Sequence, residues 1–482
     1  MINASMLPAL ATGRSTTGEM AMGDVAALRK ALEAGYGTDV AQLQGAGALR
    51  VQSLEKTMLS TIQENQHFAL FNELQKTNAT ATVDEWTEQS GVGGFLGGST
   101  NTEAGAIAAA QGDYARRVGL VKYLMTRREV SFVATLQGSI VEAEAVEARN
   151  GALQLLTDAE FLCFEGDSRV VPTEFDGIGQ QIETLDSADH VIDAEADELK
   201  SIHLVDRAAA TIAGFGNFGT PTHIFMSQLT QSDFNTHLDP AFRVSLTGSP
   251  QELMIGAPVK GISTSWGNIK TVADVFIRDE RQQRPFQLDY PAVATANAGM
   301  APAGVTAEAG AGGADTKFAA KHAGNYYYAV AGVSAAGQSP VVVADQVAVA
   351  AGQAVTLTIQ ASASGAETGY AIYRGRKNGT NQLTDLRLVK RIPRTGASTV
   401  FVDKNRDIPG TTKAYILNMA PGAQAITWRQ LLPMTKFPLY PTQAATVPWA
   451  QLLFGYLRLG KRKHHVVIKN IVPTGATWKP FE

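Results

Sequence analysis

Apolar residues recur at intervals of three and four positions between residues 141 and 162, which is the pattern of an amphipathic helix with one buried stripe. The acidic residues of this segment, among them Glu144 and Glu147, fall mostly off the stripe. We therefore expect a long helix over 141–163 whose carboxylates face solvent. The stripe consists of Val141, Ala145, Ala148, Ala152, Leu155, Leu156, Ala159 and Leu162, and Glu142 and Asp158 are further acidic residues that fall mostly off it.

Glycines mark the middle and the end of this helix. Gly151 costs about 1 kcal/mol relative to alanine in a helix interior, so it predicts a neighbour that crosses closely at that point. Gly166, in the run Phe164 to Asp167, is predicted to end the helix with a positive φ. A second tight turn is predicted at 175–178, around Gly177.

The carboxylates beside these turns allow two interpretations. Glu165 and Asp167 are either part of a metal or acid–base site or the solvated end of a structural strut. A chemical site needs a third ligand or a partner base in register, and the sequence offers none. The structural interpretation is favoured, and we predict no catalytic, cofactor-binding or metal-binding residue.

Residues 81–135 predict a long hairpin. The segments 83–86 and 118–133 are rich in strand-forming residues, and the glycine-rich run 91–98 lies between them. A phosphate-binding loop requires a lysine followed by serine or threonine at its end, whereas Ser99-Thr100-Asn101 supplies no lysine. We therefore expect a flexible hairpin that reaches a neighbouring subunit.

The rest of the first half predicts a mixture of helices and strands. The N-terminal residues predict a mobile arm over 1–23 and helices over 24–34 and 49–65. His223 and His237 are isolated, so we interpret them as structural residues and not as metal ligands. Further on, helices are expected over 199–213 and 227–238, and strands over 221–226 and 256–277.

A second domain is predicted to interrupt the first. Residues 292–314 are rich in Ala, Gly and Pro, which is typical of a flexible linker. The runs NYYYAVAGVSAAGQSP and TGYAIYRG that follow resemble strands of fibronectin type III or immunoglobulin-like modules. Short strands with turn residues between them predict an antiparallel sandwich, with strands at 326–333, 341–349, 354–360, 370–374, 386–392 and 399–402.

The C-terminal residues 411–482 read as strands that complete the sheet begun by 66–285. They contain the basic cluster 461–465, which either contacts nucleic acid or forms a turn that pairs with acidic neighbours. Flanking strands favour the turn.

Composition and charge add a preference for assembly. Charged residues make up 18% of the chain, which predicts much surface buried against other chains. Residues 141–210 carry 17 acidic and 4 basic side chains, whereas 411–482 carry 9 basic and 1 acidic. These regions either pair within one chain or meet between neighbouring copies. The net charge of −4 does not favour nucleic-acid binding overall.

The single cysteine, Cys163, excludes an intrachain disulfide and suits a reducing cytoplasm. Its place at the apolar end of the predicted helix indicates a core residue and not a nucleophile. No signal peptide or membrane-spanning run is visible, so no membrane partner is expected.

The order of arm, hairpin, long helix, mixed region and C-terminal strands resembles the major capsid protein of tailed bacteriophages, which has the Hong Kong 97-type shell fold. The resemblance rests on Trp86–Val133, the 141–163 helix and the turns at 164–167 and 175–178. It implies an α+β fold with peripheral and axial domains and an inserted β-sandwich. The implied boundaries are 1–65 for the arm, 66–135 for the extended loop, 136–285 for the spine helix and axial domain, 300–410 for the sandwich and 411–482 for the completing strands.

This resemblance implies a mechanical function. Copies would form hexamers and pentamers of an icosahedral shell in the virion, assembled in the host cytoplasm around double-stranded DNA that is enclosed without sequence specificity. A separate scaffolding protein, a portal and a decoration protein would be partners, and no cofactor is implied. Some relatives cross-link the extended loop through lysine, and Lys122 lies in that segment. The sandwich would lie on the outer surface.

Two other classes stay open at this point. A hydrolase with a carbohydrate-binding sandwich would need paired carboxylates or a divalent-cation site, which the acidic run 183–198 could supply. That run lacks the glycine-punctuated spacing of a calcium loop. A tail or baseplate protein would also use such a sandwich.

Overall fold

The computed structural model describes residues 64–107, 109–136, 143–185, 188–199, 202–237, 260–280, 297–441 and 445–482. All of them belong to one compact unit. The arm predicted for 1–65 lies outside the described residues except for its last two positions, and so do the helices predicted at 24–34 and, for the most part, 49–65.

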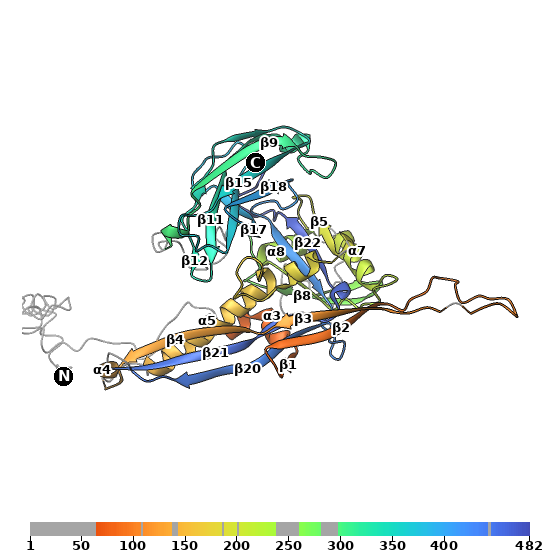
Figure 1. The fold of residues 1–482 in the computed structure, drawn as a ribbon, viewed down its shortest axis with the longest axis horizontal. Helices are drawn as coiled ribbons and strands as arrows, with labels where there is room; N and C mark the ends of the chain where they lie inside the picture. Colours follow the sequence, from red (N-terminus) through yellow and green to blue (C-terminus); the bar gives the residue numbers. More distant parts are fainter. Residues whose placement is uncertain are drawn as a thin grey trace, which may run out of the picture. The chain divides into compact units, whose positions relative to one another are not determined.

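A four-stranded sheet, in the order β1-β20-β21-β4, lies beside the spine helix α5 (Figure 1). Its two longest strands come from the C-terminal part of the chain, and β21 pairs antiparallel with both β20 and β4. The strands are β1 Lys76–Asn78, β4 Lys122–Ser131, β20 Ile426–Pro438 and β21 Thr446–Leu459.

The predicted hairpin is formed by β2 (Val83–Gly91) and β3 (Asp113–Leu120), which pair antiparallel from Val83 opposite Leu120 outward. The predicted strand through Val133 is wrong at its end, because the short helix α4 begins at Phe132 and runs to Leu136. The Ser131 hydroxyl accepts the N–H of Ala134 at 3.2 Å, which favours a helical turn there.

The spine helix is confirmed as α5, Ala143–Glu165. A Cβ at Gly151 would lie 2.0 Å from the Gln451 side-chain oxygen, so the predicted close crossing is made by β21. The single-stripe prediction is wrong. None of residues 143–150 is buried and Ala145 of the predicted stripe is exposed, whereas Leu153 and Thr157 are buried off the stripe. Near the end Phe161, Cys163 and Phe164 are all buried, because sheets and loops surround the helix there.

The predicted positive φ of Gly166 is wrong: neither Gly166 nor Gly177 has one. Both positions need glycine because two backbone segments touch. A Cβ on Gly166 would lie 2.3 Å from the carbonyl oxygen of Phe175, and one on Gly177 would lie 2.7 Å from that of Leu162. The N–H of Gly177 donates to Gly166 across this contact at 2.9 Å.

A six-stranded sheet, in the order β5-β22-β19-β6-β8-β7, forms the second part of the body. Its core contains Ile224, Met226, Ile416 and Ile468, all fully buried, and α7 packs against it. Strands from 411–482 therefore pair with earlier strands in both sheets. The strands are β5 Val191–Asp193, β6 His223–Met226, β7 Gly261–Thr264, β8 Gly267–Ala273, β19 Thr412–Leu417 and β22 Val466–Ile471.

The remaining helices are short. The helices α7 and α8 agree with the predicted ones to within a few residues, whereas α3 and α6 were not predicted. The helix predicted from 199 begins at 202, because Leu199 packs into the core ahead of it. They are α3 Ala69–Glu73, α6 Ile178–Glu183, α7 Ile202–Ala213 and α8 Gln228–His237.

Residues 304–403 form two facing sheets, β18-β15-β9 and a second one built on β12-β11-β16-β17, with Tyr328, Leu357 and Tyr370 buried in their shared core. The linker predicted over 292–314 is wrong in its second half. Residues 304–311 form β9, because their alternate side chains pack against β15, which pairs with them along its whole length. The longer strands are β9 Gly304–Ala311, β11 Tyr328–Ser334, β15 Gln353–Gln360, β16 Gly369–Gly375, β17 Leu386–Pro393 and β18 Ser398–Asp403.

The predicted strand over 341–349 is split in two, and β10 is separate from β11. The shorter strands are β10 Gly324–Tyr326, β12 Gly337–Gln338, β13 Val342–Val343 and β14 Val347–Val349. Both breaks occur where the chain moves from one sheet to another, since β10 pairs with β14 and β13 pairs with β11.

Candidate functional site

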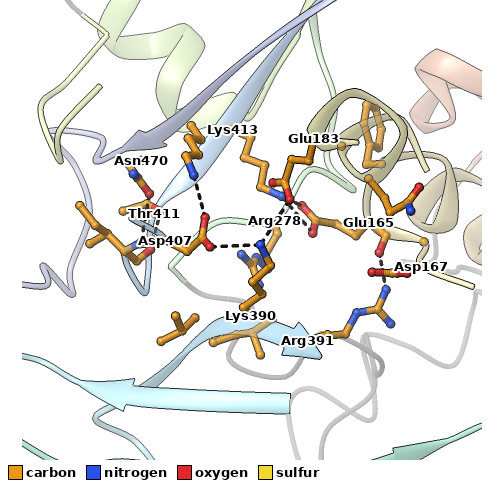
Figure 2. A pocket seen from close by; sticks show the side chains of 18 of the residues that line it. Glu165, Asp167, Glu183, Arg278, Lys390, Arg391, Asp407, Thr411, Lys413 and Asn470 are labelled. Carbon is orange, nitrogen blue, oxygen red and sulfur yellow. Dashed lines mark hydrogen bonds and ion pairs between the residues drawn. The ribbon is translucent and has the colours of Figure 1, made fainter. Parts of the chain in front are cut away.

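Charged side chains from several elements converge at the end of the spine helix, around a cavity of ≈ 80 Å³ (Figure 2). We call this group the junction cluster. Its members come from α5, α6, the turn after α5, β17, the segment after β18, β19 and β22. They are Glu165, Glu174, Glu183, Lys390, Arg391, Asp407, Lys413 and Lys469.

Glu165 is the carboxylate that sequence reasoning left without a partner, and the structure provides one. Its Oε1 lies 3.1 Å from the Lys413 Nζ, and the Tyr415 hydroxyl donates to the same oxygen at 3.3 Å. Burial alone would raise the pKa of Glu165, but Lys413 and Arg278 outweigh it and lower that pKa to about 2. Glu165 is therefore ionised at any physiological pH and cannot act as a proton donor.

Asp407 lies between two lysines. Its carboxylate is 2.9 Å from the Lys469 Nζ and 3.3 Å from the Lys390 Nζ, and Lys390 also reaches Glu183 at 3.3 Å. Burial opposes ionisation of Asp407, yet Lys390 and Lys469 lower its pKa well below the usual range. The carboxylates in turn raise the pKa of Lys390. This part of the junction cluster is held fully charged.

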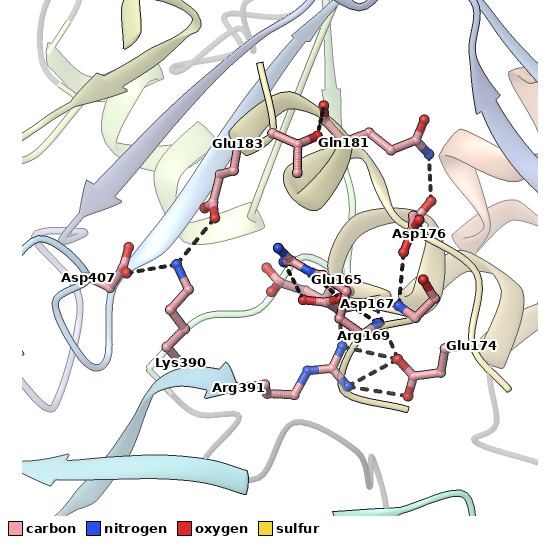
Figure 3. A network of polar contacts seen from close by, with 12 residues as sticks. Glu165, Asp167, Arg169, Glu174, Asp176, Gln181, Glu183, Lys390, Arg391 and Asp407 are labelled. Carbon is pink, nitrogen blue, oxygen red and sulfur yellow. Dashed lines mark hydrogen bonds and ion pairs between the residues drawn. The ribbon is translucent and has the colours of Figure 1, made fainter. Parts of the chain in front are cut away.

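Glu174 and Arg391 form the most buried pair of the cluster (Figure 3). Both Arg391 terminal nitrogens lie 3.2 Å from the Glu174 Oε2, and the same oxygen accepts the N–H of Asp167 at 3.2 Å. Arg391 also donates to the backbone carbonyl of Glu165. Burial raises the pKa of Glu174, although Arg391 acts in the opposite direction. The pair ties β17 to the turn that follows the spine helix.

The aspartates of the two turns are also engaged. Asp167 binds the Arg169 guanidinium at 2.7 Å, and Asp176 accepts the N–H of Ser168 at 2.9 Å. Within the described residues, no group of three or more His, Cys, Asp or Glu side chains could hold a metal ion. The arrangement neutralises charges in pairs and connects elements, so what it can do is hold a corner in one geometry.

Some of the segregated acidic and basic residues form ion pairs within one chain. Glu165 with Lys413, and Glu144 with Lys436 at 2.5 Å, each join the acidic region 141–210 to the basic region 411–482. For these residues the intrachain alternative is the correct one.

The basic cluster 461–465 forms a turn, η10 (Arg462–His464), as the favoured interpretation predicted. Arg462 lies 3.4 Å from Glu88 of the hairpin. Burial lowers the pKa of His465 to about 3 and also lowers that of His464, so both rings are neutral at pH 7.

Cys163, His223 and His237 are the isolated residues that the sequence predicts to be structural. Cys163 is fully buried, and burial raises the pKa of its thiol well above the usual value, which makes it inert as a nucleophile. His223 Nε2 lies 3.4 Å from Glu73. The side chain of His237 lies outside the described residues.

Sequence reasoning missed Glu160, which is fully buried. A signal was present, since position 160 follows Leu156 by one helical turn and therefore lies on the apolar stripe. A charged residue at such a position requires specific partners.

The hairpin presents large apolar side chains that have no core of their own. Val92, Phe95, Leu96 and Ile107 at its tip are 87%, 78%, 91% and 94% exposed. Its base is fixed: Asp84 receives two hydrogen bonds from Arg429, at 2.8 and 3.0 Å, and one from the Tyr456 hydroxyl at 2.5 Å. Burial would raise the pKa of Asp84, but these donors lower it. Large apolar side chains that are this exposed are candidates for a protein contact site.

None of the helices in the described ranges is long and apolar enough to cross a membrane.

The relatives that match this chain in sequence are phage proteins of one kind. No family model matches the chain. The major capsid proteins of Staphylococcus phage S25-3 and Staphylococcus phage K are each 25% identical to it over 460 residues, which cover 92% of this chain and 94% of theirs.

Structural comparison also gives matches among solved proteins. The SrpI encapsulin of Synechococcus elongatus has a TM-score of 0.44 at 10% identity and covers 92% of this chain and 99% of its own. The capsid protein of a native GTA particle has a TM-score of 0.46 at 10% identity, with 90% and 100% covered. The protein from Mycobacterium phage Bobi has a TM-score of 0.45 at 8% identity, with 91% and 100% covered.

Proposed function

We propose that this chain is a major capsid protein of tailed phages with the Hong Kong 97-type fold and a non-enzymatic component of the virion. Its copies would form hexamers and pentamers that close into an icosahedral head around packaged double-stranded DNA. The observation that carries the proposal is the hairpin. It places apolar residues that are exposed among the described residues at the end of two paired strands, where a neighbouring molecule could bury them.

The geometry of the body supports a load-bearing function. The spine helix, both body sheets and the turns after α5 are joined by ion pairs whose carboxylates are held ionised, as Glu165 and Asp407 show. A subunit that holds its shape can transmit strain to its neighbours without unfolding. The exposed edges of the hairpin would be covered by a neighbouring copy.

The two facing sheets of residues 304–403 would form the inserted immunoglobulin-like domain and decorate the outer surface of the shell. The contacts of the two sheets support this proposal. Arg391 ties β17, which belongs to one sheet, to the turn after the spine helix, whereas β18 and β9 belong to the opposite sheet. A separate scaffolding protein, a portal and a decoration protein would complete the particle.

The hairpin proposal is tested by changing Phe95 and Leu96 together to serine. We expect the subunit to keep its circular dichroism spectrum and its unfolding midpoint, since both side chains are exposed, but to lose assembly in size-exclusion chromatography. A matched control changes Val400 and Val402 of β18, which are 59% and 43% exposed, to serine. The proposal fails if the hairpin variant assembles as well as the control does.

A further inference from the structure

Two acidic side chains lie fully buried where the spine helix meets the short helix α3. Glu160 of α5 and Asp274, which follows β8, each have 0% of their surface exposed. The N–H groups of Leu70 and Phe71, in the first turn of α3, donate to the two Glu160 oxygens at 2.7 and 2.8 Å. Phe68, the residue before α3, makes no side-chain cap. Glu160 therefore supplies the acceptor that this helix end lacks.

Asp274 fixes the third element of the contact. Its Oδ1 accepts the N–H of Phe276 at 2.8 Å, and the ring of Phe276 stacks on that of Phe68 at a centroid distance of 5.3 Å. Its other oxygen, Oδ2, is buried, and no donor from the described residues reaches it. A buried carboxylate oxygen without a hydrogen-bond donor is strongly unfavourable. The Asp274 Oδ2 therefore requires a proton that the hydrogen bonds described so far do not supply.

Among the residues that the structure describes, no cation compensates the two acids. The groups that act on Glu160 and Asp274 are each other and the N–H groups of Leu70, Phe71 and Phe276, and the Cys163 thiol of α5 faces both. The charged side chains of the adjoining segments have contacts elsewhere. Glu73 of α3 pairs with Lys270 and His223, Lys76 lies over the Phe71 ring, and Arg278 acts on Glu165.

We propose that Glu160 and Asp274 share one proton in the folded subunit and act as an alkali-sensitive latch that holds α3, with residues 64–68 before it, against the spine helix. One carboxyl group donates its O–H to the other, which gives the Asp274 Oδ2 its missing partner and leaves a single negative charge for the backbone N–H groups to stabilise. Removal of the proton places two carboxylates side by side without a cation, and their repulsion opens the contact.

The direction of the pH dependence follows from burial. Burial raises the pKa of Glu160 well above its usual value, the neighbouring Asp274 raises it further, and burial likewise raises the pKa of Asp274. The closed state therefore binds the proton more tightly than the open state does, and rising pH favours opening. The latch is closed below the pKa of the pair and opens as the pH rises through it.

Hydrogen exchange of the full-length protein tests the latch. The protection factor of peptides that cover residues 64–74 is measured from about pH 6 to about pH 10, for the unmodified protein and for Asp274→Asn. The amide of the variant donates to Glu160 and its oxygen still accepts from Phe276, so both hydrogen bonds persist without a shared proton. We expect the unmodified protein to lose protection about tenfold per pH unit above the opening pH, and the variant to keep it to a pH about one unit higher or more.

An exposed aspartate provides the matched control. Asp345→Asn makes the same chemical change at an exposed position, and its profile should coincide with that of the unmodified protein. The proposal is overturned if Asp274→Asn loses protection at the same pH as the unmodified protein, or if protection of the unmodified protein does not change with pH.

Infrared spectroscopy provides a measurement that needs no variant. The unmodified protein should show the carbonyl band of a protonated carboxyl group at neutral pH, and this band should decrease over the pH range in which protection of residues 64–74 falls. Absence of any such band at neutral pH would contradict a shared proton even if Asp274→Asn failed to fold.

Discussion

Glycines at the end of the spine helix are required by contact and not by backbone conformation. At Gly166 the space for a Cβ is filled by the carbonyl oxygens of Phe175 and Leu162, at 2.3 and 2.6 Å. Backbone atoms cannot move aside as a flexible side chain can, so even the smallest side chain separates the two turns.

Gly166→Ala should therefore lower the free energy of unfolding by about 1 to 3 kcal/mol or more, the usual cost of overpacking a close contact. Chemical unfolding of the full-length protein measures it. Gly396→Ala is the control, because nothing lies within 4 Å of a Cβ there. Equal stability of the two variants would show that the turns tolerate separation.

Ionisation of Glu165 makes the free energy of unfolding depend on pH in the acid range. Its pKa in the folded protein, about 2, lies below the ordinary glutamate value, so the folded state favours the ionised form. The stabilisation is present above the unfolded-state pKa and is lost as the pH falls toward 2, with an upper limit of about 3 kcal/mol. Unfolding midpoints measured from about pH 5 to about pH 2 should fall less steeply for Glu165→Gln than for the unmodified protein. Parallel slopes would contradict this assignment.

At the scale of elements, the local sequence pattern predicts where a helix forms, whereas the burial of its residues depends on segments that are distant in the sequence. The spine helix could be predicted because its apolar residues recur at helical spacing. Its last turns could not, since Glu160, Phe161 and Cys163 become buried only when sheets from distant parts of the chain surround them. The partners of Glu165 and Glu174 lie 248 and 217 positions away, so no local spacing predicts the junction cluster.

The strand β9 illustrates the same limit. Its sequence, Gly304 to Ala311, is rich in small residues and is typical of a linker, yet it forms one edge of the β18-β15-β9 sheet. Pairing with β15 overrides a weak local preference.

The two facing sheets should be separable from shell formation. Leu357→Ala in β15 removes a fully buried side chain and should destabilise these sheets by about 2 to 5 kcal/mol. Hydrogen exchange should increase in 304–403 while the body sheets stay protected and particles still form. Thr358→Ala, the next residue on the same strand and partly exposed, is the control. Loss of particles in the Leu357 variant alone would show that the sheets are needed for assembly.

At the scale of the whole molecule, the order of elements carried the sequence prediction further than any single motif did. The hairpin, the spine helix and the C-terminal strands were all expected, and relatives named major capsid proteins match 92% of the chain. The segregation of charge along the sequence is compatible with pairing within one chain and with pairing between copies. The positions of Lys413 and Lys436 assign these two residues to intrachain pairs.

Electron microscopy of the full-length protein under assembly conditions tests the central claim most directly. We predict closed shells of icosahedral symmetry built from hexamers and pentamers, in which the hairpin of each subunit lies on a neighbour. A monomer that stays dispersed under assembly conditions, or assembly only into tubes or rings typical of tails and baseplates, would contradict it.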